Sequence, residues 1–217
     1  MAIEDQLSHA EGFASVITQV ETSSEGLDHS GIEPGMADAI VSRDVVGSGA
    51  RGPLLDLGSG GGLPGLLLAH MYPSRRIVLL DASERRTAFL MESVVECGWS
   101  GRVEVVRGRA EELARLPGLR GIFSVVTARS FGSPPVTAEC STGFINAGGY
   151  LIVSEPPATQ GSVRWPAEDL KELGLEPLPS VVGNYNYQVL RQATVCSDRY
   201  PRRTGIPAKR PIYSLDV

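Results

Sequence analysis

Short apolar runs alternate with longer segments of helical periodicity from residue 53 onward. The runs are bounded by Gly, Pro, Asp or Ser, which is typical of strands, whereas the intervening segments repeat apolar residues at helical spacing. The predicted strands are 53–58, 76–82, 102–108, 122–128 and 149–155. The predicted helices are 63–72, 83–98, 134–145 and 166–174.

This alternation predicts an α/β fold in which a mainly parallel sheet carries helices on both faces. Residues 176–195 hold two more apolar runs, and we expect them to form a C-terminal antiparallel hairpin. Pro64 falls in the first turn of its predicted helix, where proline is tolerated, and Ser83 is the expected N-cap of the next one.

The N-terminal part of the chain lacks the alternation. Residues 4–20 and 36–46 have helical spacing, and 47–52 has the composition of a linker. We therefore expect two parts, a helical extension over 1–52 and an α/β domain over 53–217.

Composition excludes several classes of protein. The fractions of hydrophobic residues (42%) and charged residues (21%) are ordinary for a globular protein. The start of the chain lacks the order of a secretory signal, and the longest apolar run, near 63–69, is too short to span a membrane. The three cysteines and three histidines are scattered, which disfavours a metal site or a redox pair. We expect a cytoplasmic protein that binds no metal.

Charge is unevenly distributed along a chain whose formal net charge is −5. The first fifty residues hold nine acids and a single arginine, whereas residues 191–213 hold six cations and one acid. The sequence "YPRRTGIPAKRP" at 200–211 is rich in both cations and prolines. This basic segment is either solvated surface or a surface that faces an anion.

The most informative stretch is "LLDLGSGGGLPG" at 54–65. Glycines let the backbone turn sharply and approach a ligand, and the following helix presents unpaired N–H groups. Its glycines fit the dinucleotide pattern G-x-G-x-x-G as well as the pattern D-x-G-x-G-x-G typical of S-adenosylmethionine (AdoMet) sites. A purely structural glycine turn is the third reading. The last two glycines of the AdoMet pattern are Gly60 and Gly62.

Two carboxylates bear on the choice of ligand. Asp56 lies beside the loop, where it can hold the AdoMet ammonium and would repel a pyrophosphate. Asp81 ends the second predicted strand, where it can accept hydrogen bonds from both ribose hydroxyls of either cofactor. Arg129, in "TARSF" after the fourth strand, is either a surface arginine or a donor that faces cofactor or substrate.

Six segments in order resemble the RsmG (GidB) family, bacterial methyltransferases that act on guanine N7 in 16S ribosomal RNA. They are "LLDLGSGGGLPGLLLA", "LLDASERRTAFL", "VEVVRGRAEEL", "FSVVTARSF", "AGGYLIV" and "YPRRTGIPAKRP". The resemblance implies a Rossmann-like class I methyltransferase fold with a seven-stranded sheet, AdoMet as cofactor, and a monomer acting on 16S ribosomal RNA or the small subunit.

The resemblance also implies roles for individual residues. Gly58 and Leu63 would line the methionine and ribose part of the AdoMet site, Asp81 would hold the ribose, and Ala110 with Glu111 would meet the adenine. Arg129 would complete the pocket near cofactor and substrate, and it is the candidate catalytic residue. In the basic segment, the expected RNA phosphate ligands are Arg202, Arg203, Lys209 and Arg210.

The sequence departs from the family pattern at two places. The family's His-x-x-Asp-Ser segment has only a weak counterpart at 27–31, and its Lys-Gly pair after the fifth strand is replaced by "SEPP" at 154–157, which contains Glu155. Three alternatives therefore stay open: a small-molecule methyltransferase, a non-catalytic RNA-binding protein and a dehydrogenase.

Overall fold

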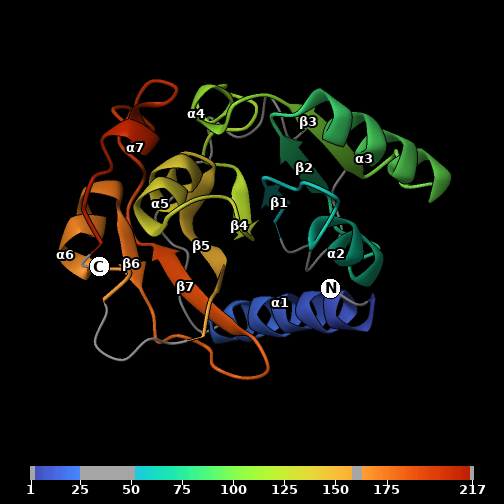
Figure 1. Ribbon diagram of the computed structural model, residues 1–217, viewed down its shortest axis with the longest axis horizontal. Helices are drawn as coiled ribbons and strands as arrows, with labels where there is room; N and C mark the ends of the chain where they lie inside the picture. The colour runs from blue at the N-terminus through green and yellow to red at the C-terminus, as the bar shows by residue number, and fades with distance from the viewer. Residues whose placement is uncertain (1–2, 25–51, 158–162, 216–217) are drawn as a thin grey trace.

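The computed structural model describes residues 3–24, 52–157 and 163–215, and these form a seven-stranded sheet with helices on both faces (Figure 1). The strands are β1 Leu54–Leu57, β2 Ile77–Asp81, β3 Val103–Arg107, β4 Phe123–Ala128, β5 Ile145–Glu155, β6 Leu175–Pro177 and β7 Asn186–Gln192. The helices are α1 Ile3–Ser24, α2 Gly65–Met71, α3 Glu84–Glu96, α4 Ala110–Leu113, α5 Pro134–Thr142, α6 Ala167–Leu170, η1 Lys171–Leu173 and α7 Ile206–Lys209.

The strand order is β3-β2-β1-β4-β5-β7-β6. Strands β1 to β5 pair in parallel, whereas β7 is antiparallel to both β5 and β6. The order therefore reverses between β1 and β4, and ligands bind beyond the carboxyl ends of strands at such a switch point. The predicted fold class, including the C-terminal antiparallel hairpin, is confirmed.

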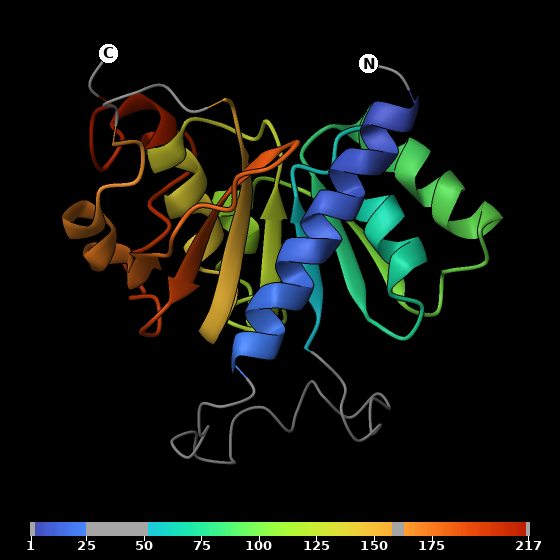
Figure 2. The same cartoon turned by 90° about the horizontal axis from the view of Figure 1, so that it is seen from below.

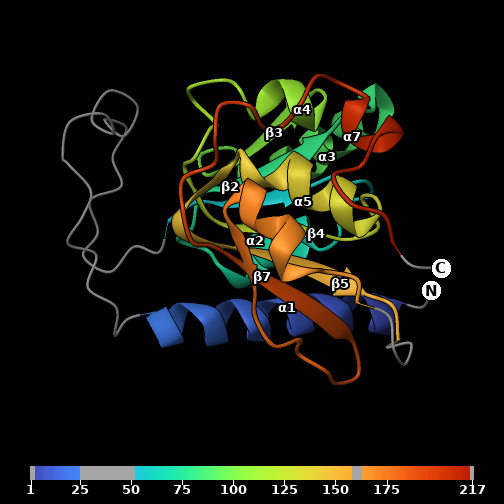
Figure 3. The ribbon, with the colours of Figure 1, turned by 90° about the vertical axis from the view of Figure 1, so that its left-hand side faces the viewer.

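Two apolar cores cover the two faces of the sheet. Helices α1, α2 and α3 pack on one face of the sheet (Figure 2). Phe13 and Ile17 of α1 are fully buried in this core. Helices α4, α5 and α6 pack on the other face together with Tyr200 and Tyr213 from the end of the chain. Figure 3 shows these layers, with α1 on one side of the sheet and α4, α5 and α7 on the other.

Two predicted boundaries are wrong. The helix predicted over 134–145 ends at Thr142, because residues from Ile145 onward continue into β5, which pairs with β4. The helix predicted over 63–72 begins at Gly65, so Pro64 is its N-cap residue and lies outside the first turn. The predicted helix over 36–46 and most of the linker over 47–52 lie outside the described residues.

Candidate functional site

The glycine loop connects β1 to α2 at the switch point of the sheet. Gly58 has φ +73° and Gly62 has φ +92°, a region that favours glycine. A Cβ atom at Gly58 would lie 2.7 Å from the Phe131 ring, whereas one at Gly61 would meet nothing within 4 Å. The loop is therefore tightly packed at its base and open at its tip.

Asp56 is buried beneath this loop, with 1% of its surface exposed. Its Oδ1 accepts a hydrogen bond from the Thr127 hydroxyl at 3.0 Å, and its Oδ2 accepts one from the Gly65 N–H at 3.1 Å. These bonds fasten the start of α2 to strands β1 and β4. The predicted contact of Asp56 with the AdoMet ammonium stays a prediction.

Burial raises the pKa of Asp56 to about 6, although the hydrogen bonds from Thr127 and Gly65 and the positive charge of Arg129 oppose the shift. A raised pKa means that the folded state binds this proton more tightly than the unfolded state does. Ionisation of Asp56 should therefore lower the free energy of unfolding by about 3 kcal/mol as pH rises from about 4 to above 6.

The Asp56→Asn variant tests this pH dependence, because the amide removes the titration and keeps polar atoms at the same place. Urea unfolding of wild type and variant should show that the variant gains stability relative to wild type between pH 4.5 and pH 7.5. A difference between the two proteins that is the same at both pH values would contradict the buried-acid assignment.

Asp81 lies at the carboxyl end of β2, facing the same loop. Its Oδ2 accepts a hydrogen bond from the Gly60 N–H at 2.9 Å, and its Oδ1 accepts one from the Ser83 N–H at 2.8 Å. The Arg86 guanidinium lies 3.5 Å from Oδ2. A carboxylate has about four acceptor positions, so these two N–H bonds orient Asp81 and leave capacity for a ribose diol. The cradle of Asp81 and open glycine backbone fits the adenosine half of AdoMet.

The predicted adenine contacts follow the next strand. Ala110 is the first residue of α4, directly beyond β3, and the Gly108 N–H donates to the Asp81 carbonyl at 3.1 Å. The Glu111 side chain is engaged elsewhere, because its Oε1 accepts a hydrogen bond from the Gly205 N–H at 2.9 Å. The structure thus brings Ala110 to the same edge as Asp81. A contact of either residue with adenine stays a prediction.

Arg129 follows β4 and is partly buried. Its positive charge opposes ionisation of His9, whose pKa is lowered mainly by burial, and it favours the ionised form of Asp56. The next residue, Ser130, has φ +54°, which is costly for a side chain other than glycine and is common at functional turns. The positive charge of Arg129 therefore acts both on the base of the glycine loop and on α1. Its predicted catalytic role is untested.

The basic segment, residues 200–211, is called the C-terminal strap below. Arg202 of the strap donates to Glu139 of α5 from Nε at 2.8 Å and from Nη2 at 2.6 Å, and its backbone N–H donates to the same carboxylate at 2.8 Å. Glu139 is completely buried. Two acids of α4 also accept hydrogen bonds from the strap: Glu111 from the Gly205 N–H, and Glu112 from the Thr204 hydroxyl. The strap is therefore anchored to α4 and α5, and whether Arg202 also reaches RNA stays a prediction.

The sequence interpretation missed both Glu139 and Thr127. An acid inside the otherwise apolar or small-residue helix over 134–142 was the available signal for a buried ion pair. Nothing near Thr127 in the sequence marks it, because its partner Asp56 lies on a different strand and comes opposite it only through the register of β1 and β4.

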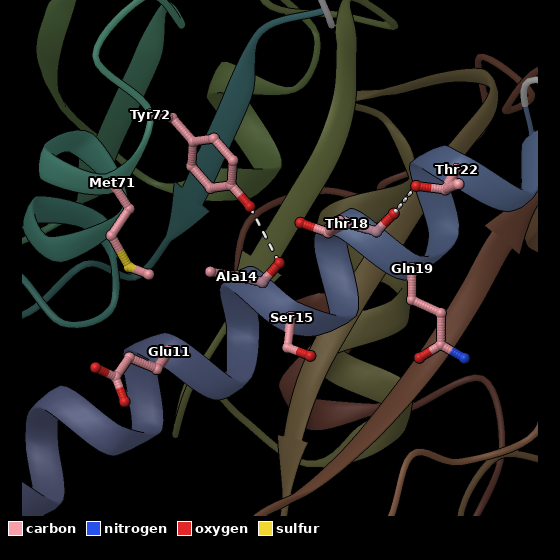
Figure 4. Close-up of a pocket in the computed structure, with 8 residues that line it drawn as sticks. All are labelled: Glu11, Ala14, Ser15, Thr18, Gln19, Thr22, Met71 and Tyr72. Carbon is pink, nitrogen blue, oxygen red and sulfur yellow. Dashed lines mark hydrogen bonds between the residues drawn. The ribbon is translucent and has the colours of Figure 1, made fainter.

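A groove of about 710 Å³ lies between α1 and the end of α2 (Figure 4). It is lined by α1 residues such as Ser15 and Thr18 together with Met71 and Tyr72 at the end of α2. The Tyr72 hydroxyl donates to the Ala14 carbonyl at 3.1 Å, so this contact fastens α1 to α2. Because Tyr72 precedes β2, the groove lies near the opposite end of the strands from Asp81.

Two further observations concern metals and membranes. Within the ranges that the structure describes, no group of three or more His, Cys, Asp or Glu residues could hold a metal ion. No helix in these ranges has both the length and the apolar character needed to cross a bilayer.

Comparison with known proteins gives a consistent result. The family model of rRNA small subunit methyltransferase G (GidB) matches residues 32–157. A ribosomal RNA small subunit methyltransferase G from Dehalococcoides mccartyi is 33% identical over 180 residues, which cover 79% of this chain and 76% of the relative. The protein of the same name from Prochlorococcus marinus is 34% identical over 165 residues, covering 73% of this chain and 66% of that relative.

Solved structures support the fold. The antibiotic-resistance methyltransferase Kmr superposes with a TM-score of 0.51 at 17% identity, covering 66% of this chain and 88% of that protein. A sarcosine dimethylglycine methyltransferase from Galdieria sulphuraria, described as putative, superposes with a TM-score of 0.50 at 11% identity and covers 66% of this chain and 79% of that one. Both are methyltransferases, and the likeness concerns the fold alone.

Proposed function

The chain belongs to the rRNA small subunit methyltransferase G family, and we propose that it transfers a methyl group from AdoMet to guanine N7 in 16S ribosomal RNA. It is an AdoMet-dependent methyltransferase, which excludes the dehydrogenase alternative. The observation that carries the proposal is the match to this family across the glycine loop, β2, α4 and the segment after β4. We further propose that it acts as a monomer in the cytoplasm, where its RNA substrate is made.

The residues that would hold AdoMet lie around the switch point. Asp81 would accept hydrogen bonds from the ribose hydroxyls, the open backbone at Gly60 would leave room for the ligand beside Gly58, and Ala110 would border the adenine. When bound, AdoMet supplies an electrophilic methyl group on a positively charged sulfur.

Methylation at guanine N7 makes few demands on protein side chains. N7 carries a lone pair and no proton, so the protein has no proton to remove and needs no general base. The protein must instead align the base and stabilise the positive charge that the purine acquires. Glu155, which lies at the carboxyl end of β5, is a carboxylate that suits this charge.

The exposed cations of the strap are the proposed phosphate ligands. Arg203, Lys209 and Arg210 are exposed, whereas Arg202 is held by Glu139. No ion pair among the described residues engages those three side chains. Their charge would supply affinity for RNA without reading its sequence.

Replacing Arg203, Lys209 and Arg210 together with alanine should weaken RNA methylation and reduce the slope of log affinity against log salt by about 2–3, since each lost phosphate contact removes about 0.7–0.9. AdoMet affinity should be unchanged. The matched control replaces Arg76, Lys171 and Arg191, three cations paired with surface acids elsewhere. An unchanged salt slope in the strap variant would remove the strap from the RNA interface.

The proposed function is tested by incubating small ribosomal subunits and naked 16S RNA with labelled AdoMet and mapping the product. We expect label at N7 of a guanine, and methylation at a different atom would refute the N7 assignment. Robust turnover of a low-molecular-weight acceptor in the presence of ribonuclease, without RNA labelling, would instead support the small-molecule alternative. Failure to bind AdoMet in calorimetry would leave only the non-catalytic alternative.

A further inference from the structure

A second pocket, of about 260 Å³, opens between the end of β5 and the hairpin formed by β6 and β7. Glu155, Arg164 and Trp165 line it on one side, and the hairpin residues Asn186 and Gln188 line it on the other. This pocket is separate from the cradle formed by Asp81 and the glycine loop, and no role has been given to it so far.

The pocket lies at the same edge of the sheet as the AdoMet cradle. Ala128, the last residue of β4, pairs with Val153, and Glu155 follows two positions later on β5. Neighbouring strands are about 4.8 Å apart, so β5 is two strand spacings, about 10 Å, from β1. That separation suits a purine that lies across the end of β4, with one edge toward the cradle and the other toward this pocket.

Most polar groups at the pocket already have partners. The Asn186 side chain donates to the Pro156 carbonyl at 3.3 Å, and the Gln188 side chain is bonded to Ser180 and to the Leu178 carbonyl. Two features stand apart. Glu155 and Arg164 form an ion pair in which Nε donates to Oε2, with side chains 12% and 36% exposed.

Trp165 is the second feature. The residue is 93% buried, since 7% of its surface is exposed, and its Nε1–H has no hydrogen-bond partner within the described part of the chain. A buried donor without a partner costs about 1–3 kcal/mol, and such groups are rare in folded proteins. The indole ring of Trp165 therefore contributes a buried aromatic wall to the pocket.

The rim of the pocket is apolar and exposed. Val163 and Val182 line it, and each is 72% exposed, which places them among the most exposed large apolar side chains described. The rings of Pro156 and Pro157 add two more apolar surfaces. A flat aromatic ligand would cover these surfaces while its polar edge meets the ion pair.

We propose that this pocket reads the Watson–Crick edge of the acceptor guanine, and this inference rests on the proposed function. That edge presents two donors, N1–H and the N2 amino group, beside one acceptor, O6. The Glu155 carboxylate matches the two donors, and the Arg164 guanidinium matches O6. Adenine presents a donor and an acceptor in the opposite arrangement, so the same pair rejects it. Enzymes that modify an unstacked base read it by such edge contacts.

Inosine distinguishes recognition of the Watson–Crick edge from binding of any purine, because it keeps N7, N1–H and O6 but lacks the N2 amino group. The assay uses a small-subunit RNA fragment that carries guanosine or inosine at the mapped methylation position. For wild type we expect kcat/KM to fall about tenfold with inosine, the lower part of the range for one lost base-reading contact. For Glu155→Gln the guanosine and inosine substrates should differ by less than about threefold.

Two controls isolate the effect of Glu155. Glu176→Gln removes an acid from a surface ion pair with Arg191 on the same hairpin and should leave the guanosine preference at the wild-type value. AdoMet affinity measured by calorimetry should be the same in all three proteins. Equal use of guanosine and inosine by wild type, or a wild-type preference that persists in Glu155→Gln, would overturn the proposal.

A binding measurement decides the pocket independently of turnover. Trp99 and Trp165 are the two tryptophans, so a Trp99→Phe protein reports on Trp165 alone. Guanosine at millimolar concentration should quench its fluorescence more strongly than inosine does, and Glu155→Gln should abolish the difference. If the wild type methylates no RNA, the proposed function fails. An absence of guanosine-specific quenching refutes the pocket assignment in either case.

Discussion

We expect Arg202→Ala to lower the free energy of unfolding by about 3–5 kcal/mol, because the substitution leaves a buried carboxylate without its charged partner. Glu139 is completely buried, and Arg202 supplies two of the side-chain hydrogen bonds that compensate its charge. A loss of this size is comparable to a large fraction of the total stability of an average domain. Urea unfolding monitored by circular dichroism measures it.

Two matched variants separate the ion pair from the positive charge of the strap. Arg203→Ala removes the neighbouring exposed cation and should change stability by less than about 0.5 kcal/mol. Adding Glu139→Gln to Arg202→Ala removes the buried charge and keeps an acceptor for the backbone N–H of residue 202. The double variant should therefore recover at least half of the lost free energy of unfolding. If Arg202→Ala lowered the free energy of unfolding by less than about 1 kcal/mol, the ion pair between Arg202 and Glu139 would not be what holds the strap against α5.

Asp81→Ala should weaken AdoMet binding by about 100-fold or more, since two hydrogen bonds that ribose hydroxyls donate to a carboxylate are worth about 1.5–3 kcal/mol each. The same side chain fixes the Gly60 and Ser83 N–H groups, so part of the loss would come from a less ordered loop. Calorimetric titration with AdoMet, at a temperature where circular dichroism shows the variant folded, measures the change.

Glu84→Ala is the matched control for Asp81. Glu84 begins α3, three positions away, and its side chain is 84% exposed in an ion pair with Arg107. Its loss should change AdoMet affinity less than about threefold. If Asp81→Ala bound AdoMet within threefold of wild type, the ribose would have to be held elsewhere, and the cofactor assignment of the β2 edge would be wrong.

Local patterns predicted most of the sheet and the position of Asp81 at the end of β2. The apolar runs and glycine loop identified β1, β2 and Asp81, because each depends on residues close together in sequence. Partners that meet only through folding escaped prediction. Arg202 and Glu139 are 63 positions apart, so the sequence shows the cation but not the buried carboxylate that holds its guanidinium against α5. Glu155 stood out in the sequence as a departure from the family, but its partner and its pocket required the folded hairpin.

The packing of α1 has a consequence for how the chain is made. The Tyr187 hydroxyl donates to the His9 carbonyl across 178 positions, and the Phe13 and Tyr187 rings lie 4.7 Å apart. Ribosomes add about 5–20 residues per second, so roughly 10–35 s separate synthesis of the two partners. During that interval β7 has not yet been made, so it cannot cover the apolar side of α1. The core on the α1 face of the sheet is therefore completed only after β7 has left the ribosome.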